Sequence, residues 1–314
     1  MWFKEFTKSS PGILCLLLGL ASSFSLAQRP EPLAPDSDEI EVLPVQGNLY
    51  MIATGGSNIA VQLGDEGLLL VDAGNIEAGE NVLAALERLS NNPPSQLINT
   101  SILAGHIAGN QVIHPAGVGQ AIIGMPIIGH TNGLTLLATT ELGEDLPYEY
   151  WPNSTFFGVD RSLFYNGEGI EMTYQPNAIT DSDIMVYFRD SDVLVTGDIF
   201  DITQYPRVHP ELGGSLQGVI DALNRIIDIT IPRYNQQGGT LVIPGHGRIA
   251  SESDVVEYRD MVTIIRDRVQ ALLNEGKSFR EILAARPALE YDGLYSGRDW
   301  STEMFLEAVY EELR

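Results

Sequence analysis

Cysteine is almost absent from this 314-residue chain, because the single Cys15 lies in an apolar run near the N-terminus. If that segment is removed, no thiol remains, which excludes disulfide bonds, thiolate nucleophiles and thiolate metal ligands. Stability must then come from a packed core. With 44% hydrophobic residues, the chain can build one large domain, or one domain and an appendage.

Basic residues are also scarce: 18 lysines and arginines stand against 42 acidic residues, a formal net charge of −24. A surface of this charge repels nucleic-acid phosphates and anionic lipid. We therefore expect a small-molecule ligand or substrate as the partner, and neither nucleic acid nor, after signal cleavage, a membrane. The composition leaves the oligomeric state open.

The N-terminus has the pattern of a secretory signal peptide. Lys4 and Lys8 precede an apolar run at residues 12–21, and small residues follow as far as Ala27. The run is too short and too early to favour a membrane-spanning helix, although a retained anchor is the alternative. We expect a signal peptide over 1–27, a flexible Pro- and acid-rich leader over 28–39, and export to the periplasm or the medium.

Short apolar runs broken by Gly, Asn and Asp predict strands, and apolar residues at helical spacing predict helices. The order is strands, helix, strand, more strands, helix, strand, then helices. It predicts a layered α/β fold with two strand-rich halves covered by helices. Expected strands lie at 40–45, 48–54, 58–64, 67–74, 95–100, 183–188, 192–198 and 239–247, and expected helices at 79–90, 215–229, from 254 onward and at 301–313. We place one domain at 40–250 and a helical C-terminal extension at 251–314.

Histidine is rare as well, with five in the chain. His106 in "AGHIAGN" and His246 in "PGHG" stand in Gly-rich turns at strand ends, and Asp198 in "VTGDIF" ends another strand. A rigid scaffold presents functional side chains in such loops, and neighbouring glycines let a metal or a substrate come close, so these three are candidate functional residues. We expect the other histidines to be exposed or hydrogen-bonded; these are His114, His130 and His209.

Five segments in order resemble the metallo-β-lactamase-fold hydrolase superfamily over residues 40 to about 248. They are "GGSNIAVQLGDEGLLLVDAG", "INTSILAGHIAGN", "PNAITDSDIMVYF", "DVLVTGDIF" and "VIPGHG". The resemblance implies a four-layer αββα sandwich with a two-metal site, usually zinc, at one edge. It also implies that Asp72 in "LVDAG" supports the metal loop from behind.

The resemblance implies seven metal-ligand positions, and four of them have changed. The hallmark H-x-H-x-D-H falls on the segment from Ser101 to His106. The positions that no longer carry a ligand are Ser101, Leu103, Gly105 and Ile179, and those that still do are His106, Asp198 and His246. Alkyl groups have no lone pair and a neutral hydroxyl is a poor zinc ligand, so at most one ion can be held.

Two interpretations follow. The leading one is a divergent protein with a degenerate dinuclear site, which acts as a pseudoenzyme or small-molecule binding protein and, as a pseudoenzyme, holds no metal ion. The second is a hydrolase of an ester, thioester or lactam that uses one zinc or iron ion, since two imidazoles and a carboxylate suit both metals.

A third interpretation makes Ser101 a nucleophile with His106 as base, but no G-x-S-x-G motif supports it. For Asp181 and Asp183 in "TDSD" we expect hydrogen bonds to backbone amides of the turn. The sequence assigns no catalytic residue, so it leaves enzymatic activity open.

Overall fold

Two β-sheets lie at the centre of the fold in this computed structural model, which describes residues 40–119, 124–231, 239–297 and 299–314. The expected signal peptide and leader lie outside the described residues. In the first sheet seven strands follow one another in chain order, antiparallel as far as β4 and parallel from there to β7. The strands are β1 (Glu41–Pro44), β2 (Leu49–Ala53), β3 (Asn58–Gln62), β4 (Leu68–Val71), β5 (Pro94–Ile98), β6 (Ile127–His130) and β7 (Ser154–Phe156).

The second sheet has five strands in the order β12-β11-β10-β9-β8, and its only parallel pair within the described residues is β11 with β12. One buried apolar cluster takes side chains from both sheets, including Leu69 and Val71 from the first and Met172 and Val186 from the second. The sheets therefore pack face to face. The strands are β8 (Asp160–Tyr165), β9 (Glu168–Tyr174), β10 (Ile184–Phe188), β11 (Val193–Val195) and β12 (Leu241–Ile243).

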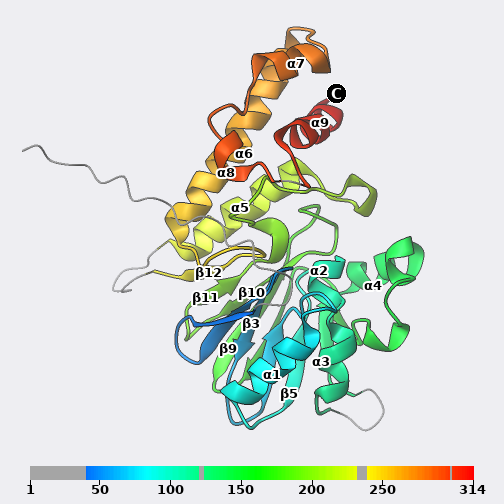
Figure 1. The fold of residues 1–314 in the computed structure, drawn as a ribbon, viewed down its shortest axis with the longest axis vertical. Helices are drawn as coiled ribbons and strands as arrows, with labels where there is room; N and C mark the ends of the chain where they lie inside the picture. Colours follow the sequence, from blue (N-terminus) through cyan, green and yellow to red (C-terminus); the bar gives the residue numbers. More distant parts are fainter. Residues whose placement is uncertain (1–39, 120–123, 232–238, 298) are drawn as a thin grey trace, which may run out of the picture. The chain divides into compact units, whose positions relative to one another are not determined.

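Helices cover the outer face of each sheet (Figure 1). Side chains of α1 and α3 join one apolar cluster with the first sheet, and α5 and α6 join another with the second. This arrangement confirms the predicted αββα sandwich of metallo-β-lactamase type. The helices before the extension are α1 (Gly79–Leu89), α2 (Ala104–Ile107), α3 (Asn110–Ala116), α4 (Thr131–Thr139) and α5 (Leu216–Thr230), and the 3-10 turns are η1 (Glu141–Gly143), η2 (Tyr148–Tyr150), η3 (Gly197–Ile199) and η4 (Pro210–Leu212).

The C-terminal region is helical, as expected, and belongs to the same compact unit as the sheets. Its long α6 runs beside α5 (Figure 1). A capping box of Ser278 and Glu281 opens α7, and a second one, formed by Ser251 and Asp254, opens α6. The elements are α6 (Glu252–Asn274), α7 (Phe279–Ala285), α8 (Asp292–Tyr295) and α9 (Thr302–Leu313). Among the described residues, no helix is both long enough and apolar enough to span a bilayer.

Aromatic contacts join the extension to the loop that follows β11. Tyr205 stacks on Phe305 of α9 with ring centroids 4.6 Å apart, and both side chains are buried. The hydroxyl of Tyr258 on α6 donates a hydrogen bond to the Gln204 carbonyl at 3.0 Å. The extension therefore supports this loop, which begins at Asp198.

We expect Phe305→Ala to lower the free energy of unfolding by about 3–5 kcal/mol, because it removes a buried ring and leaves a cavity. Urea denaturation followed by circular dichroism measures this loss. Phe157→Ala is the control, since that side chain is 87% exposed, and we expect a change within about 0.5 kcal/mol. Equal losses for both variants would contradict the buried contact.

Candidate metal centre

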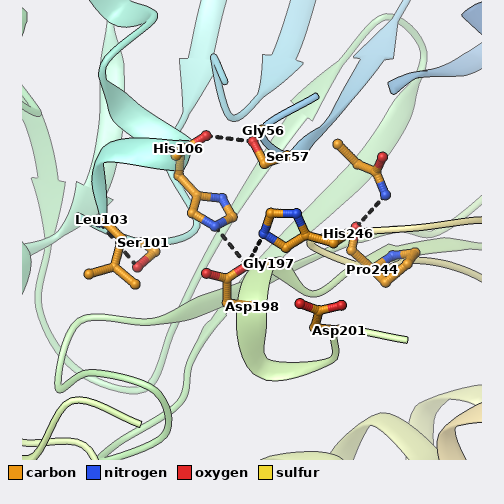
Figure 2. Close-up of polar contacts among 12 residues, drawn as sticks. Gly56, Ser57, Ser101, Leu103, His106, Gly197, Asp198, Asp201, Pro244 and His246 are labelled. Carbon is orange, nitrogen blue, oxygen red and sulfur yellow. Dashed lines mark hydrogen bonds and ion pairs between the residues drawn. The ribbon is translucent and has the colours of Figure 1, made fainter. Parts of the chain in front are cut away.

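Three predicted ligands converge at the edge where the two sheets present their strand ends (Figure 2). His106 lies on α2 after β5, Asp198 lies in η3 after β11, and His246 follows β12. Oδ1 of Asp198 is 3.0 Å from Nε2 of His106 and 3.2 Å from Nε2 of His246. All three ligand atoms lie within 4.8 Å of one another.

These spacings fit a single tetrahedral ion. Ligand atoms 2.0–2.2 Å from such an ion lie about 3.3 Å from one another. Nε2 of His106 and Oδ1 of Asp198 are both buried, yet their contact lacks hydrogen-bond geometry and neither atom has a hydrogen-bond partner in the described part of the chain. Buried polar atoms without partners are costly, so an ion that accepts their lone pairs would relieve this cost.

Asp72 lies behind His106, where the resemblance places it. Its Oδ2 is 2.8 Å from Nδ1 of His106, and both side chains are buried. The same carboxylate accepts hydrogen bonds from the backbone N–H and the hydroxyl of Thr100, at 2.7 and 2.6 Å. Asp72 thus fixes the ring orientation of His106 and leaves Nε2 facing Asp198.

Hydrogen bonds from Asn58 of the first sheet hold the loop that carries His246. Asn58 at the start of β3 donates side-chain hydrogen bonds to the carbonyls of Pro244 and Gly247, both at 2.9 Å, and its backbone N–H donates to Gly245. A Cβ at Gly245 would lie 2.4 Å from Oδ1 of Asp198. Glycine is therefore needed here for the loop to approach the carboxylate.

Charge and burial oppose each other in this cluster. Burial disfavours protonated His106, but the charges of Asp198 and Asp72 outweigh it and raise the pKa of His106 well above its ordinary value. Burial likewise opposes protonation of His246, and Asp198 and then Asp201 raise its pKa. For Asp198, burial favours the neutral acid, but the two imidazoles lower its pKa well below the usual range. The carboxylate and the two imidazoles thus favour one another's charged forms.

The four changed ligand positions do not contribute a metal ligand. Ile179 is buried in the apolar cluster beneath the second sheet, and Leu103 packs against that cluster. Ser101 is buried and accepts a long hydrogen bond of 3.4 Å from the N–H of Leu103. At Gly105 a Cβ would meet nothing within 4 Å, so the side of the loop where the resemblance places a carboxylate is open.

The remaining histidines all have partners outside the cluster. His114 contacts the carbonyl of Met125 at 3.1 Å and His130 that of Gly158 at 3.2 Å, while His209 pairs with Glu211 at 2.9 Å. Both acids of "TDSD" bond backbone amides, as expected. The N–H of Thr180 donates to Asp183 and the N–H of Asn177 to Asp181.

Sequence reasoning missed two residues at this edge. Asn58 belongs to the "GGSN" turn and carries no signal of its distant partners. Asp201 is buried, accepts hydrogen bonds from Thr203 and Gln204, and acts on His246 by its charge. Its spacing of three residues after Asp198 was the available signal, because both fall in the same turn.

Asp183 is a buried acid beside the cluster. Burial, with a further contribution from the charge of Asp198, raises the pKa of Asp183 to about 7, although hydrogen bonds from Thr180 and Ser101 oppose the shift. The folded protein therefore keeps a proton here at a pH where the unfolded chain, with a pKa near 3.8, has released it. Its contribution to stability is complete below about pH 4 and is lost as pH rises through about 7.

We expect Asp183→Asn to remove this pH dependence. Urea unfolding of the metal-free proteins at about pH 5 and about pH 8 should show that the parent loses more stability than the variant, by more than about 1 kcal/mol. The imidazoles of His106 and His246 titrate in both proteins, so the difference isolates Asp183. Parallel losses in the two proteins would contradict a raised pKa.

Comparison with known proteins agrees with this architecture. The sequence model of the metallo-beta-lactamase superfamily matches residues 45–246. A search of curated protein sequences found no match. Among solved structures, the metallo-beta-lactamase from Pontibacter korlensis has a TM-score of 0.58 at 17% identity, covering 72% of this chain and 99% of its own. The metallo-beta-lactamase DIM-1 has a TM-score of 0.56 at 16% identity, covering 73% and 99%.

The stereoselective inverting sec-alkylsulfatase Pisa1 from Pseudomonas sp. aligns over more of the chain. Its TM-score is 0.66 at 15% identity, and the match covers 87% of this chain. The match covers 50% of the alkylsulfatase chain, so this chain spans about half of its length. At such identities these structural neighbours show the shared fold alone. The sequence model of the superfamily, however, matches more than half of the chain. The protein therefore belongs to the metallo-beta-lactamase superfamily.

Proposed function

We propose that this protein is a hydrolase that uses one metal ion, zinc or iron(II), held by His106, Asp198 and His246. The substrate class is a small molecule with an ester, thioester or lactam bond. The observation that carries the proposal is the convergence of two imidazole nitrogens, at 3.0 and 3.2 Å, on a buried carboxylate oxygen that has no hydrogen bond within the described residues.

The donor set suits such an ion, because two imidazoles and one carboxylate leave coordination positions open. When bound, the ion supplies Lewis-acid chemistry: it polarises a carbonyl group and lowers the pKa of water. Asp72 holds the His106 ring, and Asn58 holds the backbone of the His246 loop. The side chains of Asp198 and His246 are 22% and 30% exposed, so a substrate reaches the cluster from their side.

Sequence features support the remaining parts of the proposal. A net charge of −24 disfavours polyanionic substrates and favours neutral or cationic small molecules. The pattern over residues 1–27 supports export to the periplasm or the medium. The absence of imidazole at the positions of Ser101, Leu103 and Ile179 supports a single-ion site over a dinuclear one.

A pseudoenzyme or small-molecule binding protein is the second candidate. It is favoured by the loss of the carboxylate at Gly105 and by the apolar packing of Leu103 and Ile179. In that case the three remaining ligands would be kept for binding, with no turnover. Metal content and hydrolysis of the same preparation separate the two candidates.

We expect protein purified without chelator to contain about one equivalent of metal per chain, and His246→Ala to reduce this to a trace. Inductively coupled plasma mass spectrometry gives the content. Hydrolysis of aryl esters, a thioester and a chromogenic β-lactam should fall roughly a hundredfold in the variant. His209→Ala is the control, because that ring lies outside the cluster. Metal without hydrolysis, or no more than a trace of metal in the parent, would reject the hydrolase and favour the binding protein.

Gly105→Asp should strengthen metal binding by about tenfold or more, because it adds a carboxylate beside His106 where there is free space. Titration with cobalt(II), followed by absorption spectroscopy, measures the affinity. Gly105→Ala carries the same backbone change without the carboxylate, so its affinity should equal that of the parent. If the aspartate and alanine variants bind equally, the open side of Gly105 does not face the metal.

A further inference from the structure

The turn between β2 and β3 contacts both loops that carry the imidazole ligands. On one side, the hydroxyl of Ser57 donates a hydrogen bond at 2.5 Å to the carbonyl of Gly105, the residue before His106 (Figure 2). On the other side, the side chain of Asn58 donates to two carbonyls of the loop that carries His246, both at 2.9 Å. Two neighbouring residues of the chain therefore hold both histidine loops.

Hydrogen bonds within the turn, residues 54–58, hold it in one conformation. The hydroxyl of Thr54 accepts from the N–H groups of Gly56 and Ser57, at 3.1 and 3.0 Å, and donates to the Ser57 carbonyl at 2.7 Å. The side chains of Thr54, Ser57 and Asn58 are all buried. Because a change of shape would leave buried polar groups without partners, the turn is a rigid support for the loops that it contacts.

The two histidine loops come from different sheets. His106 follows β5 of the first sheet and His246 follows β12 of the second, and their ring centroids are 6.4 Å apart. The Ser57 contact stays within the half built on the first sheet, whereas Asn58 reaches the second, where its backbone N–H also donates to the Gly245 carbonyl at 2.8 Å. Successive side chains of an extended segment point in opposite directions, so one short turn can reach both loops.

We propose that this turn sets the separation of the two imidazole ligands, and that Ser57 and Asn58 are positioning residues for His106 and His246. The inference rests on the proposed single-ion site for its functional meaning. An ion held about 2.0–2.2 Å from each ligand atom tolerates little change in the spacing of its ligands. Loss of either contact frees one histidine loop to move relative to the other, so both contacts are needed to keep the ligands at the distance that binds an ion.

The experiment compares Ser57→Ala, Asn58→Ala and the double variant with two matched controls. Ser95→Ala removes a buried hydroxyl that donates to the Leu68 carbonyl at 3.1 Å. Gln62→Ala removes a buried amide from the last residue of β3, the strand that Asn58 begins. Both controls lie at the end of the first sheet opposite the histidine loops. Each variant is studied as the full chain after its unfolding free energy has been measured.

The first measurement is the ring ¹H–¹⁵N NMR spectrum of the histidines in metal-free protein. We expect Ser57→Ala to shift the resonances of His106 and Asn58→Ala to shift those of His246, because each variant loses the contact that holds its loop. The two controls should shift neither ring. An unshifted ring in either case would overturn the inference, with or without metal binding by the parent. If an alanine variant fails to fold, Ser57→Cys, a weaker donor, or Asn58→Ser, with one donor in place of two, takes its place.

The second measurement is cobalt(II) affinity, together with the visible spectrum of the bound ion. We expect each single variant to weaken binding by about 10-fold and to change the spectrum, and the controls to leave both unchanged. The double variant should weaken binding by less than about 30-fold rather than by the product of about 100-fold, because loss of one contact already frees the spacing.

The remaining outcomes separate the two proposals. A double variant that loses the full product would show that the two loops are held independently, and this would overturn the inference. If the parent takes up no cobalt, the proposed function fails, and the metal-free NMR result alone decides the inference. If the parent and both single variants bind cobalt equally, the inference fails and the proposed function stands.

Discussion

Oδ1 of Asp198 is the atom on which the site depends. It is buried between two imidazole nitrogens and has no hydrogen bond among the described residues, and a charge in that state needs positive charge close by. The surrounding structure keeps the charge in place: Asp72 fixes one ring, and Asn58 fixes the backbone that carries the other. Gly245 lets that backbone pass within contact distance of the carboxylate.

The sequence alone allowed prediction of the sandwich and of the three converging ligands. The strand and helix patterns predict two strand-rich halves covered by helices, and the resemblance to the superfamily implies the four-layer order and the ligand role of His106, Asp198 and His246. Each of these three residues follows a strand end next to a glycine, where a rigid edge presents side chains. The helices α3 and α4 were not predicted, because "NQVIHPA" contains Pro115 and the apolar stripe of α4 is short and interrupted by Gly133. Local signals of this kind are too weak to outweigh turn residues.

The partners of the site could not be predicted, because they depend on contacts between distant segments. Asn58 donates hydrogen bonds to Pro244 and Gly247, which lie 186 and 189 residues further along the chain. The backbone hydrogen bond from Ile184 to Thr100 joins two sheets whose packing no local pattern specifies. Such contacts show why membership of a superfamily leaves the chemistry open: the fold is shared at 15–17% identity, whereas the chemistry depends on the side chains at the site.

The stacked pair of Tyr205 and Phe305 has a consequence for how the chain can be divided. Tyr205 lies seven residues after Asp198 along the chain, so the segment that carries this carboxylate packs against the last helix. Removing residues 251–314 would take away Tyr258, Tyr295 and Phe305 and expose the rings of Phe200 and Tyr205 that pack against them. The sandwich and the helical tail share one apolar cluster, so moving the sandwich into another protein would require the tail as well.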